Sequence, residues 1–161
     1  MPIVRLRQIK KEIRILGLTL ATRSRGFRII GVVFKGNMFL DGVLSSYAGM
    51  NQDLNVIVSR MIKASKHFNQ IRVIIYDEDS SLSLNLDPWI LFENTGKPVL
   101  SLIKDEEIDE RFMFNWKSWT VFSAGLGKND ASKVLDVSTR DGEYPEVLRI
   151  AELISKGLHN L

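Results

Sequence analysis

The sequence contains no cysteine. That absence excludes disulfide bonds, thiolate metal ligands and a cysteine nucleophile, and it is typical of intracellular proteins. No apolar run approaches the roughly 20 residues that are needed to span a bilayer, and no signal-like segment opens the chain. We therefore expect a cytoplasmic protein with no membrane partner and no disulfide-linked partner.

An acidic residue is also absent where a functional strand would often carry one. Residues 16–26 read LGLTLATRSRG, so an apolar run ends in two threonines and two arginines. The two histidines of the chain, His67 and His159, each lie near the end of a predicted helix. Neither has a serine or cysteine partner that would suggest a catalytic triad.

Charge is unevenly distributed along the chain. The formal net charge is +3, yet residues 1–28 hold eight Arg or Lys residues and one acid. A basic segment on a mildly acidic remainder suggests a polyanionic partner near that segment. A basic N-terminus that is merely solvated is the alternative interpretation.

Hydrophobic periodicity predicts one domain over residues 1–161. The chain is long enough to bury a core, and 45% of its residues are hydrophobic. The predicted strands are residues 13–20, 27–34, 38–46, 71–76, 99–103 and 119–122, and the predicted helices start at Asn51, Asp87, Asn129 and Pro145. This order predicts an α/β fold with a ribonuclease H-like mixed sheet, in which three antiparallel strands are followed by parallel strands and flanked by helices. The last helix should pack on the sheet through Val147, Ile150, Ala151, Ile154 and Leu158, whereas Arg149 and Glu152 should point elsewhere.

Two acids stand at positions where a strand could present them to a ligand. Asp77 directly follows a buried strand and is itself followed by Glu78 and Asp79. Ligand sites in open α/β sheets lie beyond such strand ends, and carboxylate oxygens there could hold a divalent metal. A polar loop that ends the strand is the alternative. Asp41-Gly42 interrupts another predicted strand, which places Asp41 on a polar face or at a bulge.

Two further segments allow both a binding and a structural interpretation. SAGLGKNDAS, residues 123–132, lacks the spacing of a P-loop, but its helix start and Lys128 could bind an anion such as phosphate. An ordinary turn and cap is the alternative. RFMFNWKSW, residues 111–119, interleaves aromatic and basic residues that could stack on unpaired bases. Alternating aromatics are also typical of the buried face of a strand.

Four separated blocks of the sequence point to one family. They are GVVFKGNMFLDGVLSS, RVIIYDEDSSLSLNLD, ENTGKPVLSLI and YPEVLRIAELISKG. In this order they resemble the signature blocks of an archaeal family of unknown function that is distantly related to endonuclease V, with some members labelled endonuclease dU. The resemblance implies a ribonuclease H-like fold and Mg²⁺- or Mn²⁺-dependent phosphodiester cleavage in DNA beside a deaminated base.

The resemblance also implies residue roles. Asp77 falls on the acid of the family's fourth-strand LDG motif, and Asp41 falls on the Asp of its LDGVL block. Both are therefore implied as catalytic residues and, together with Asp79, as metal ligands. Asn85 matches the Asn that closes the family's TFxGFN loop and is implied as a substrate contact.

The first strand departs from the family pattern. The family reads GIDDGPF there, whereas Thr19 and Leu20 stand where the paired acids belong. A threonine hydroxyl is neutral and cannot replace the negative charge that a hard divalent cation needs. The strand order that the resemblance implies places Thr19 close to Asp77.

Two hypotheses follow for the function. The first is a metal-dependent endonuclease acting on deaminated DNA, with weak or lost activity. The second is a non-catalytic protein that binds nucleic acid, or a partner protein, through the basic loop after the first strand. The residues of that loop expected to make the contact are Arg23, Arg25 and Arg28.

Overall fold

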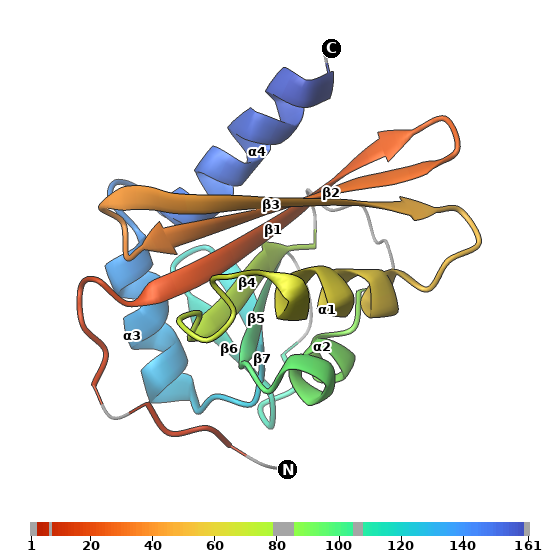
Figure 1. Cartoon of the computed structure of the whole chain (residues 1–161). Helices are drawn as coiled ribbons and strands as arrows, with labels where there is room; N and C mark the ends of the chain where they lie inside the picture. Colours follow the sequence, from red (N-terminus) through yellow and green to blue (C-terminus); the bar gives the residue numbers. More distant parts are fainter. Residues whose placement is uncertain (1–2, 7, 79–85, 105–107, 160–161) are drawn as a thin grey trace.

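A computed structural model describes residues 3–6, 8–78, 86–104 and 108–159 of the chain. Within these residues the chain forms a seven-stranded mixed sheet with four helices (Figure 1). The strands are β1 (Arg14–Arg23), β2 (Gly26–Lys35), β3 (Phe39–Gly49), β4 (Val73–Asp77), β5 (Val99–Ile103), β6 (Met113–Trp116) and β7 (Trp119–Ala124). The helices are α1 (Leu54–Ala64), α2 (Pro88–Thr95), α3 (Lys128–Ser138) and α4 (Glu146–His159).

The sheet confirms the predicted fold class. The order of its strands is β3-β2-β1-β4-β5-β7-β6. β1, β2 and β3 form an antiparallel meander, and β1 then pairs in parallel with β4, with Leu18 opposite Tyr76. β4 pairs in parallel with β5, and β7 and β6 add antiparallel strands. We call the end of the sheet where β1, β4 and β5 finish the carboxyl end, and the opposite end the amino end.

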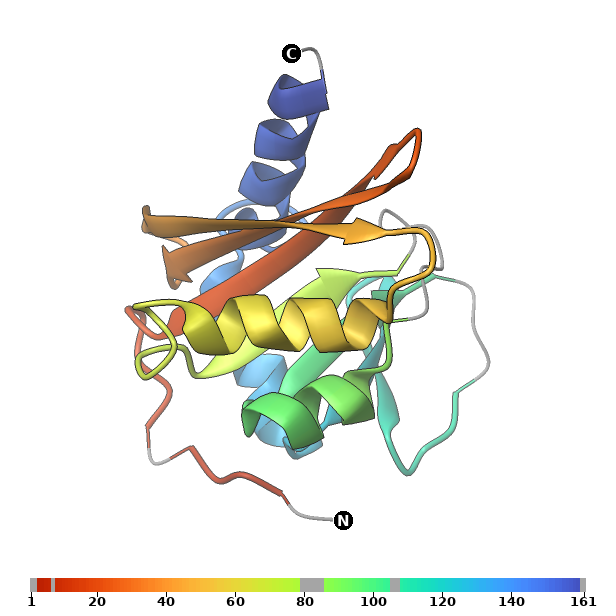
Figure 2. The ribbon, with the colours of Figure 1, turned by 45° about the vertical axis from the view of Figure 1, so that its right-hand side comes forward.

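Helices cover both faces of the sheet. α1 and α2 lie on one face and α3 and α4 on the other (Figure 1, Figure 2). Alternate residues along a strand point to opposite faces, so Ile15 joins the core under α3 and α4, whereas Leu16 joins the core under α1 and α2. This double cover explains why every residue of β4 is buried and why its sequence is a continuous apolar run.

Local start and stop signals set the helix bounds. Asp87 caps α2 by accepting backbone hydrogen bonds, and Gly96 ends it in the left-handed region at φ 75°, as predicted. α1 is capped by Asp53 instead of the predicted Asn51, because the Asp53 carboxylate accepts from the N–H of Asn55 at 3.0 Å. Within the described part of the chain, none of the helices is long and apolar enough to cross a membrane.

The aromatic run of residues 111–119 contributes to a hairpin. β6 pairs with β7 around a tight turn at Lys117, which has a φ of 52°. Trp116 and Trp119 are buried on either side of this turn. Their indole N–H groups donate to the Asp136 carboxylate and to the Glu143 carbonyl. The two tryptophans are therefore core residues, which agrees with the strand-face interpretation of the run.

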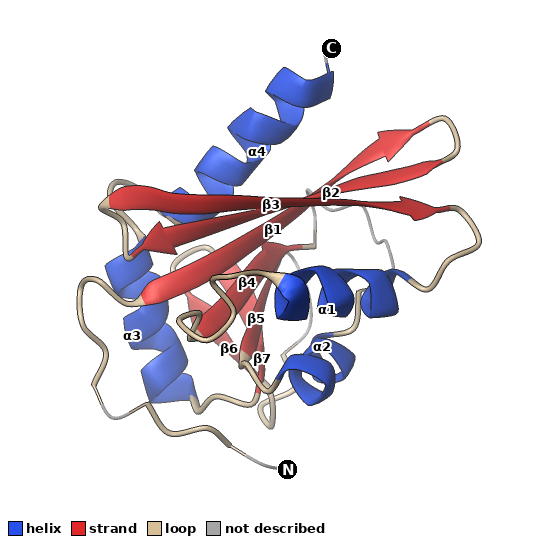
Figure 3. Cartoon of the chain, viewed as in Figure 1, coloured by secondary structure: helices blue, strands red, loops and turns tan. Residues whose placement is uncertain are grey.

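α4 starts on the sheet and then runs past it. Val147 sits so close to β1 that a Cβ at Gly17 would lie 2.8 Å from a Val147 methyl carbon. Val147 and Ala151 are buried and Ile154 is half-buried, as expected for the predicted stripe. The prediction for Leu158 is wrong: this residue is 37% exposed, because the last turns of α4 project beyond the sheet (Figure 3).

Candidate functional site

Asp77 and Thr19 lie side by side at the carboxyl end of the sheet. Asp77 is the last residue of β4 and is only 4% exposed. Leu18 pairs with Tyr76, so Thr19 lies opposite Asp77, and both side chains point to the face that carries α4. Thr19 is buried as well. The parallel pairing of β1 and β4 thus places Thr19 beside Asp77, as predicted.

The second residue of the replaced acid pair points elsewhere. Leu20 is buried in the core under α1 and α2, on the face of the sheet opposite to Asp77. Of the two positions where the family carries acids, only Thr19 therefore faces the site. An acid at position 20 would lie in an apolar core.

A tyrosine hydroxyl joins Asp77 to a second acid. Tyr144 Oη lies 3.0 Å from Asp77 Oδ2 and 2.7 Å from Glu152 Oε1. Burial and the two neighbouring carboxylates raise the pKa of Tyr144 far above its usual value, so the hydroxyl keeps its proton. Because a phenol has one proton, it can donate to only one of the two acids at a time. A proton on the other acid would complete the second hydrogen bond.

Tyr144 and Glu152 are positioned by separate contacts. The ring of Trp119 packs on the ring of Tyr144 with centroids 5.7 Å apart, and its indole N–H donates to the Glu143 carbonyl at 2.9 Å. Glu152 comes from α4, whose close approach to β1 depends on Gly17. Neither residue was predicted for the site, and the prediction that Glu152 points elsewhere is wrong because its carboxylate contacts Tyr144 beside Asp77. A signal was present, because both lie in YPEVLRIAELISKG, where they are polar positions beside an apolar stripe.

These acids do not fit a two-metal centre. Among the residues that the structure describes, no group of three or more His, Asp or Glu side chains could hold a metal ion. Asp77 and Glu152 contact the same Tyr144 hydroxyl, and Thr19 adds no charge. A two-metal centre needs several carboxylates to offset the dehydration of its cations. The donors that the described residues supply on this face are therefore fewer than such a centre requires.

Asp41 lies at the amino end of the sheet, in a bulge between β2 and β3. Arg14 Nε donates to Asp41 Oδ2 at 2.9 Å, and His67 Nδ1 lies 4.0 Å from the same oxygen. The hydrogen bond from Arg14 holds the pKa of the Asp41 carboxyl below its usual value. Arg14 and Thr19 are separated by roughly 16 Å along β1. The structure therefore does not bring Asp41 together with Asp77.

Three further predicted residues remain, and the structure describes one of them. Asp79 and Asn85 lie outside the described residues. Lys128 begins α3, one residue before the predicted cap Asn129, and is exposed. α3 follows β7, which ends at the amino end of the sheet. Lys128 and Asp77 are therefore at opposite ends.

The hairpin between β1 and β2 extends past the carboxyl end of β4 (Figure 1). Its basic residues are Arg23, Arg25 and Arg28. Arg28 pairs with Ala21, and Thr19, Ala21 and Arg23 share one face of β1. Arg23 and Arg28 thus lie on the same face as the acids. Arg23 is roughly 13 Å from Thr19 along the strand.

A cavity of about 730 Å³ opens at the carboxyl end, on the other face of the sheet. Glu78, which directly follows Asp77, lines it, and Asn55 and Asp87 add polar groups. Its apolar walls include Ile103, Met113, Trp89 and Phe122. The rings of Trp89 and Phe122 meet edge to face with centroids 6.3 Å apart. This volume is within the usual range for small-molecule sites.

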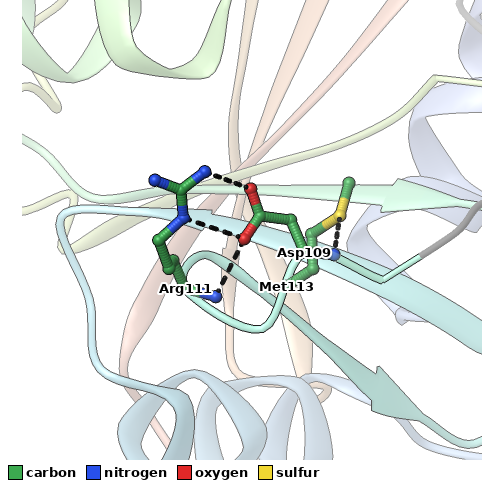
Figure 4. A network of polar contacts seen from close by, with 3 residues as sticks. All are labelled: Asp109, Arg111 and Met113. Carbon is green, nitrogen blue, oxygen red and sulfur yellow. Dashed lines mark hydrogen bonds and ion pairs between the residues drawn. The ribbon is translucent and has the colours of Figure 1, made fainter.

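Arg111, at the start of the aromatic run, is paired locally. Its guanidinium and its backbone N–H donate to the Asp109 carboxylate, and the Asp109 N–H donates to the Met113 sulfur (Figure 4). The hydrogen bonds from Arg111 hold the pKa of Asp109 below its usual value. Arg111 is therefore paired with Asp109 in the segment before β6, and its charge does not add to that of the basic hairpin.

Sequence comparison connects the chain to archaeal proteins. No family model matches it. A UPF0215 protein from Methanopyrus kandleri is 36% identical over 188 positions, covering 96% of this chain and 95% of the relative. Another from Methanothermobacter thermautotrophicus is 30% identical and covers 94% and 90%. Because 188 aligned positions exceed the 161 residues of this chain, the Methanopyrus relative has internal segments that this chain lacks.

Structure comparison gives the fold. A protein of unknown function from Archaeoglobus fulgidus matches with a TM-score of 0.78 at 20% identity, covering 90% of this chain and 97% of that chain. Endonuclease V from Ciona intestinalis, in complex with DNA containing an inosine, matches with a TM-score of 0.66 at 12% identity, covering 92% and 86%. Argonaute from Marinitoga piezophila, in complex with guide RNA, matches with a TM-score of 0.61 at 10% identity, covering 91% and 30%. The chain therefore belongs to the archaeal UPF0215 family and has a ribonuclease H-like fold similar to that of endonuclease V.

Proposed function

We propose that this protein binds nucleic acid at the carboxyl end of its sheet and cleaves phosphodiester bonds weakly or not at all. One observation carries the proposal. Asp77 and Glu152 are tied together by the Tyr144 hydroxyl on the same face that presents the arginine hairpin. The hairpin arginines, which could bind phosphates, thus lie on the same face as two acids that already contact a protein hydroxyl.

Binding is supported by the position of the hairpin charges. Phosphate contacts supply most of the non-specific affinity of proteins for nucleic acids. The hairpin between β1 and β2 extends past the acids and carries Arg23, Arg25 and Arg28. The solved complexes of Ciona endonuclease V with DNA and of Marinitoga Argonaute with RNA make the same fold a reasonable scaffold for this partner.

Weak or absent cleavage is supported by the chemistry of the acids. A divalent cation bound at Asp77 would have to compete with the Tyr144 hydroxyl and would find a neutral Thr19 where the family has an acid. Such a loose set gives little compensation for removing water from Mg²⁺. The residues of this face are therefore better suited to binding nucleic acid than to metal-dependent cleavage.

The neighbouring cavity fits the same proposal. Its Trp89 and Phe122 walls, together with the Asn55 amide and the Glu78 and Asp87 carboxylates, are suited to a flat ring with polar edges. An unpaired base has that chemistry, and base–aromatic stacking contributes about 1–3 kcal/mol.

Fluorescence anisotropy tests the binding surface. We expect weak binding to single strands and duplexes, with affinity that falls as salt rises. The double substitution Arg23→Ala and Arg25→Ala should lower the slope of log affinity against log salt by about 2 on a duplex. The control is Lys10→Ala with Lys11→Ala, which removes the same charge near the amino end. If both pairs change the slope equally, the hairpin is not the specific contact surface.

A cleavage assay tests the chemistry against the competing function, a working endonuclease on deaminated DNA. Duplexes containing deoxyuridine or deoxyinosine are incubated with Mg²⁺ or Mn²⁺. We expect little or no cleavage by the unmodified protein and a metal-dependent gain with Thr19→Asp, which adds a carboxylate beside Asp77. Thr22→Asp, an exposed position on the other face of β1, is the control. Rapid metal-dependent cleavage by the unmodified protein, abolished by Asp77→Ala, would refute weak chemistry and establish the endonuclease.

A further inference from the structure

One face of the edge strand β3 is apolar and open. Leu40, Val43 and Tyr47 pair with Phe34, Val32 and Arg28 of β2, so their side chains point to the face that carries α3 and α4. They are 46%, 47% and 44% exposed. Together with the exposed Ser45, which lies between Val43 and Tyr47 on the same face, these residues form an uncovered and mainly apolar strip.

The helix layer explains why this strip is open. α4 packs on β1 and β2, whereas the contacts of β3 with the helices are made by α1 on the opposite face. Ile150 and Ile154 on α4 are half-buried and packed against the core beneath. Leu153 and Leu158 add exposed apolar groups on the projecting part of α4.

The backbone of β3 is also available for pairing. β3 is the first strand in the sheet order, and among the residues that the structure describes no strand pairs with its outer side. Edge strands are commonly protected by Lys, Pro or a bulge. Here the bulge is confined to the Asp41 end, and residues 43–49 pair regularly with β2 and contain neither Lys nor Pro. This stretch is a template for another strand.

We propose that this strip and edge bind a second copy of the chain, through antiparallel pairing of the two β3 strands. A two-fold interface brings together the same patch of both copies, so the patch must not repel its own copy. β3 carries one charge, Asp41, and Arg14 already pairs with it. Two β3 strands therefore meet without repulsion from unpaired charges of their own. A nucleic acid is a poor occupant because an apolar strip offers its phosphates no cations.

The proposal differs from the nucleic-acid surface in position and in chemistry. Arg28 donates to Ser45 Oγ at 3.2 Å and is the residue that touches both regions. The test therefore leaves Arg28 unchanged. Loss of dimerisation and loss of nucleic-acid binding can then be measured on separate variants.

Sedimentation velocity over about 1–200 μM brackets micromolar dissociation constants. We expect a reversible dimer in the unmodified protein. Val43→Lys with Tyr47→Lys should weaken it at least about tenfold, because it places like charges across the two-fold interface. Val56→Lys, at an equally exposed valine on α1, should leave it unchanged. Thermal melts by circular dichroism show that each variant is folded. A protein that stays monomeric throughout, or a dimer that survives the double substitution, overturns the proposal.

A second measurement fixes the register. The chain has no cysteine, so a single introduced thiol is unique. Cysteines are placed one at a time at positions 43–47, with Val56→Cys as the control. In an antiparallel pair only positions near the axis bring two Cα atoms within about 4.4–6.8 Å, the range a disulfide spans. A disulfide-linked dimer confined to one or two adjacent β3 positions supports the proposal. Equal linkage at all positions including 56, or none, contradicts it.

Discussion

The two ends of the sheet each hold an acid that matches a block of the family, in opposite surroundings. At the amino end, Asp41 is partly exposed and bonded to the Arg14 guanidinium, which favours its charged form. At the carboxyl end, Asp77 is buried and contacts Tyr144, which also contacts Glu152. The amino-end acid is an ordinary ion-pair partner. The two carboxyl-end acids both contact one neutral hydroxyl.

The same comparison divides the basic residues. Arg14 and Arg23 belong to one basic segment of the sequence, but they stand at the two ends of β1. A strand of ten residues separates its ends by roughly 30 Å. Charge that is close in sequence is therefore split between an ion pair at one end and the basic hairpin at the other. Any test of the comparison should change one end and leave the other intact.

The largest effect should come from the contact that brings α4 to the carboxyl end. Gly17→Ala would place a Cβ 2.8 Å from a Val147 methyl carbon and 3.2 Å from its backbone carbonyl carbon. Overpacking of this kind costs about 1–3 kcal/mol. We expect a loss of that size in urea unfolding and a displaced Tyr144–Glu152 contact, with the Arg14–Asp41 pair unaffected.

Gly157→Ala is the control for this prediction. A Cβ at Gly157 meets nothing within 4 Å, and the residue lies inside α4. Alanine in a helix interior is favoured over glycine by about 0.8–1.0 kcal/mol. The control should therefore stabilise slightly. Equal stability of Gly17→Ala and the unmodified protein would mean that α4 does not press on β1 as described.

A smaller effect is expected from Tyr144→Phe, which removes the hydroxyl between Asp77 and Glu152. Losing a hydrogen-bond partner of a buried polar group costs about 1–3 kcal/mol. Tyr144→Phe leaves Asp77 and Glu152 without the hydroxyl that lies between them. Urea unfolding at pH 7 measures the loss of stability. Tyr47→Phe, at an exposed tyrosine, is the control and should change stability by less than about 0.5 kcal/mol.

The arrangement of elements could be predicted from the sequence because each signal is local. Residues 99–103 are a strand as predicted, and the helix between Asp87 and Gly96 has the predicted ends. Asp77 could be placed at the carboxyl end because the end of a buried parallel strand is itself a local feature. The parallel pairing then placed Thr19 beside it, as predicted.

The rest of the site depends on contacts between distant parts of the chain. Glu152 reaches Tyr144 only because α4 crosses β1 at Gly17, and nothing in the spacing of α4 specifies that crossing point. Asp41 matches a family block, yet a bulge in β3 and the partner Arg14 determine where its carboxylate lies. A sequence motif therefore predicts the position of a strand more reliably than it predicts which groups surround a side chain of that strand.

The smallest expected effect concerns the amino end. The Arg14 hydrogen bond lowers the pKa of Asp41 in the folded protein, relative to an unfolded value of about 3.9. A group with a lowered folded pKa stabilises the protein above its unfolded pKa, and that stabilisation is lost as pH falls through the folded pKa. Asp41→Asn should therefore cost up to about 1 kcal/mol at pH 7. The difference between the two proteins should shrink below about pH 4, where the unmodified Asp41 also takes up a proton. Urea unfolding from pH 7 to pH 3 measures it, and nucleic-acid binding in low salt at pH 7 should stay the same. A drop in binding would show that Asp41 serves the carboxyl end after all, and a stability difference that grows at low pH would contradict the stabilising role of the Arg14 hydrogen bond.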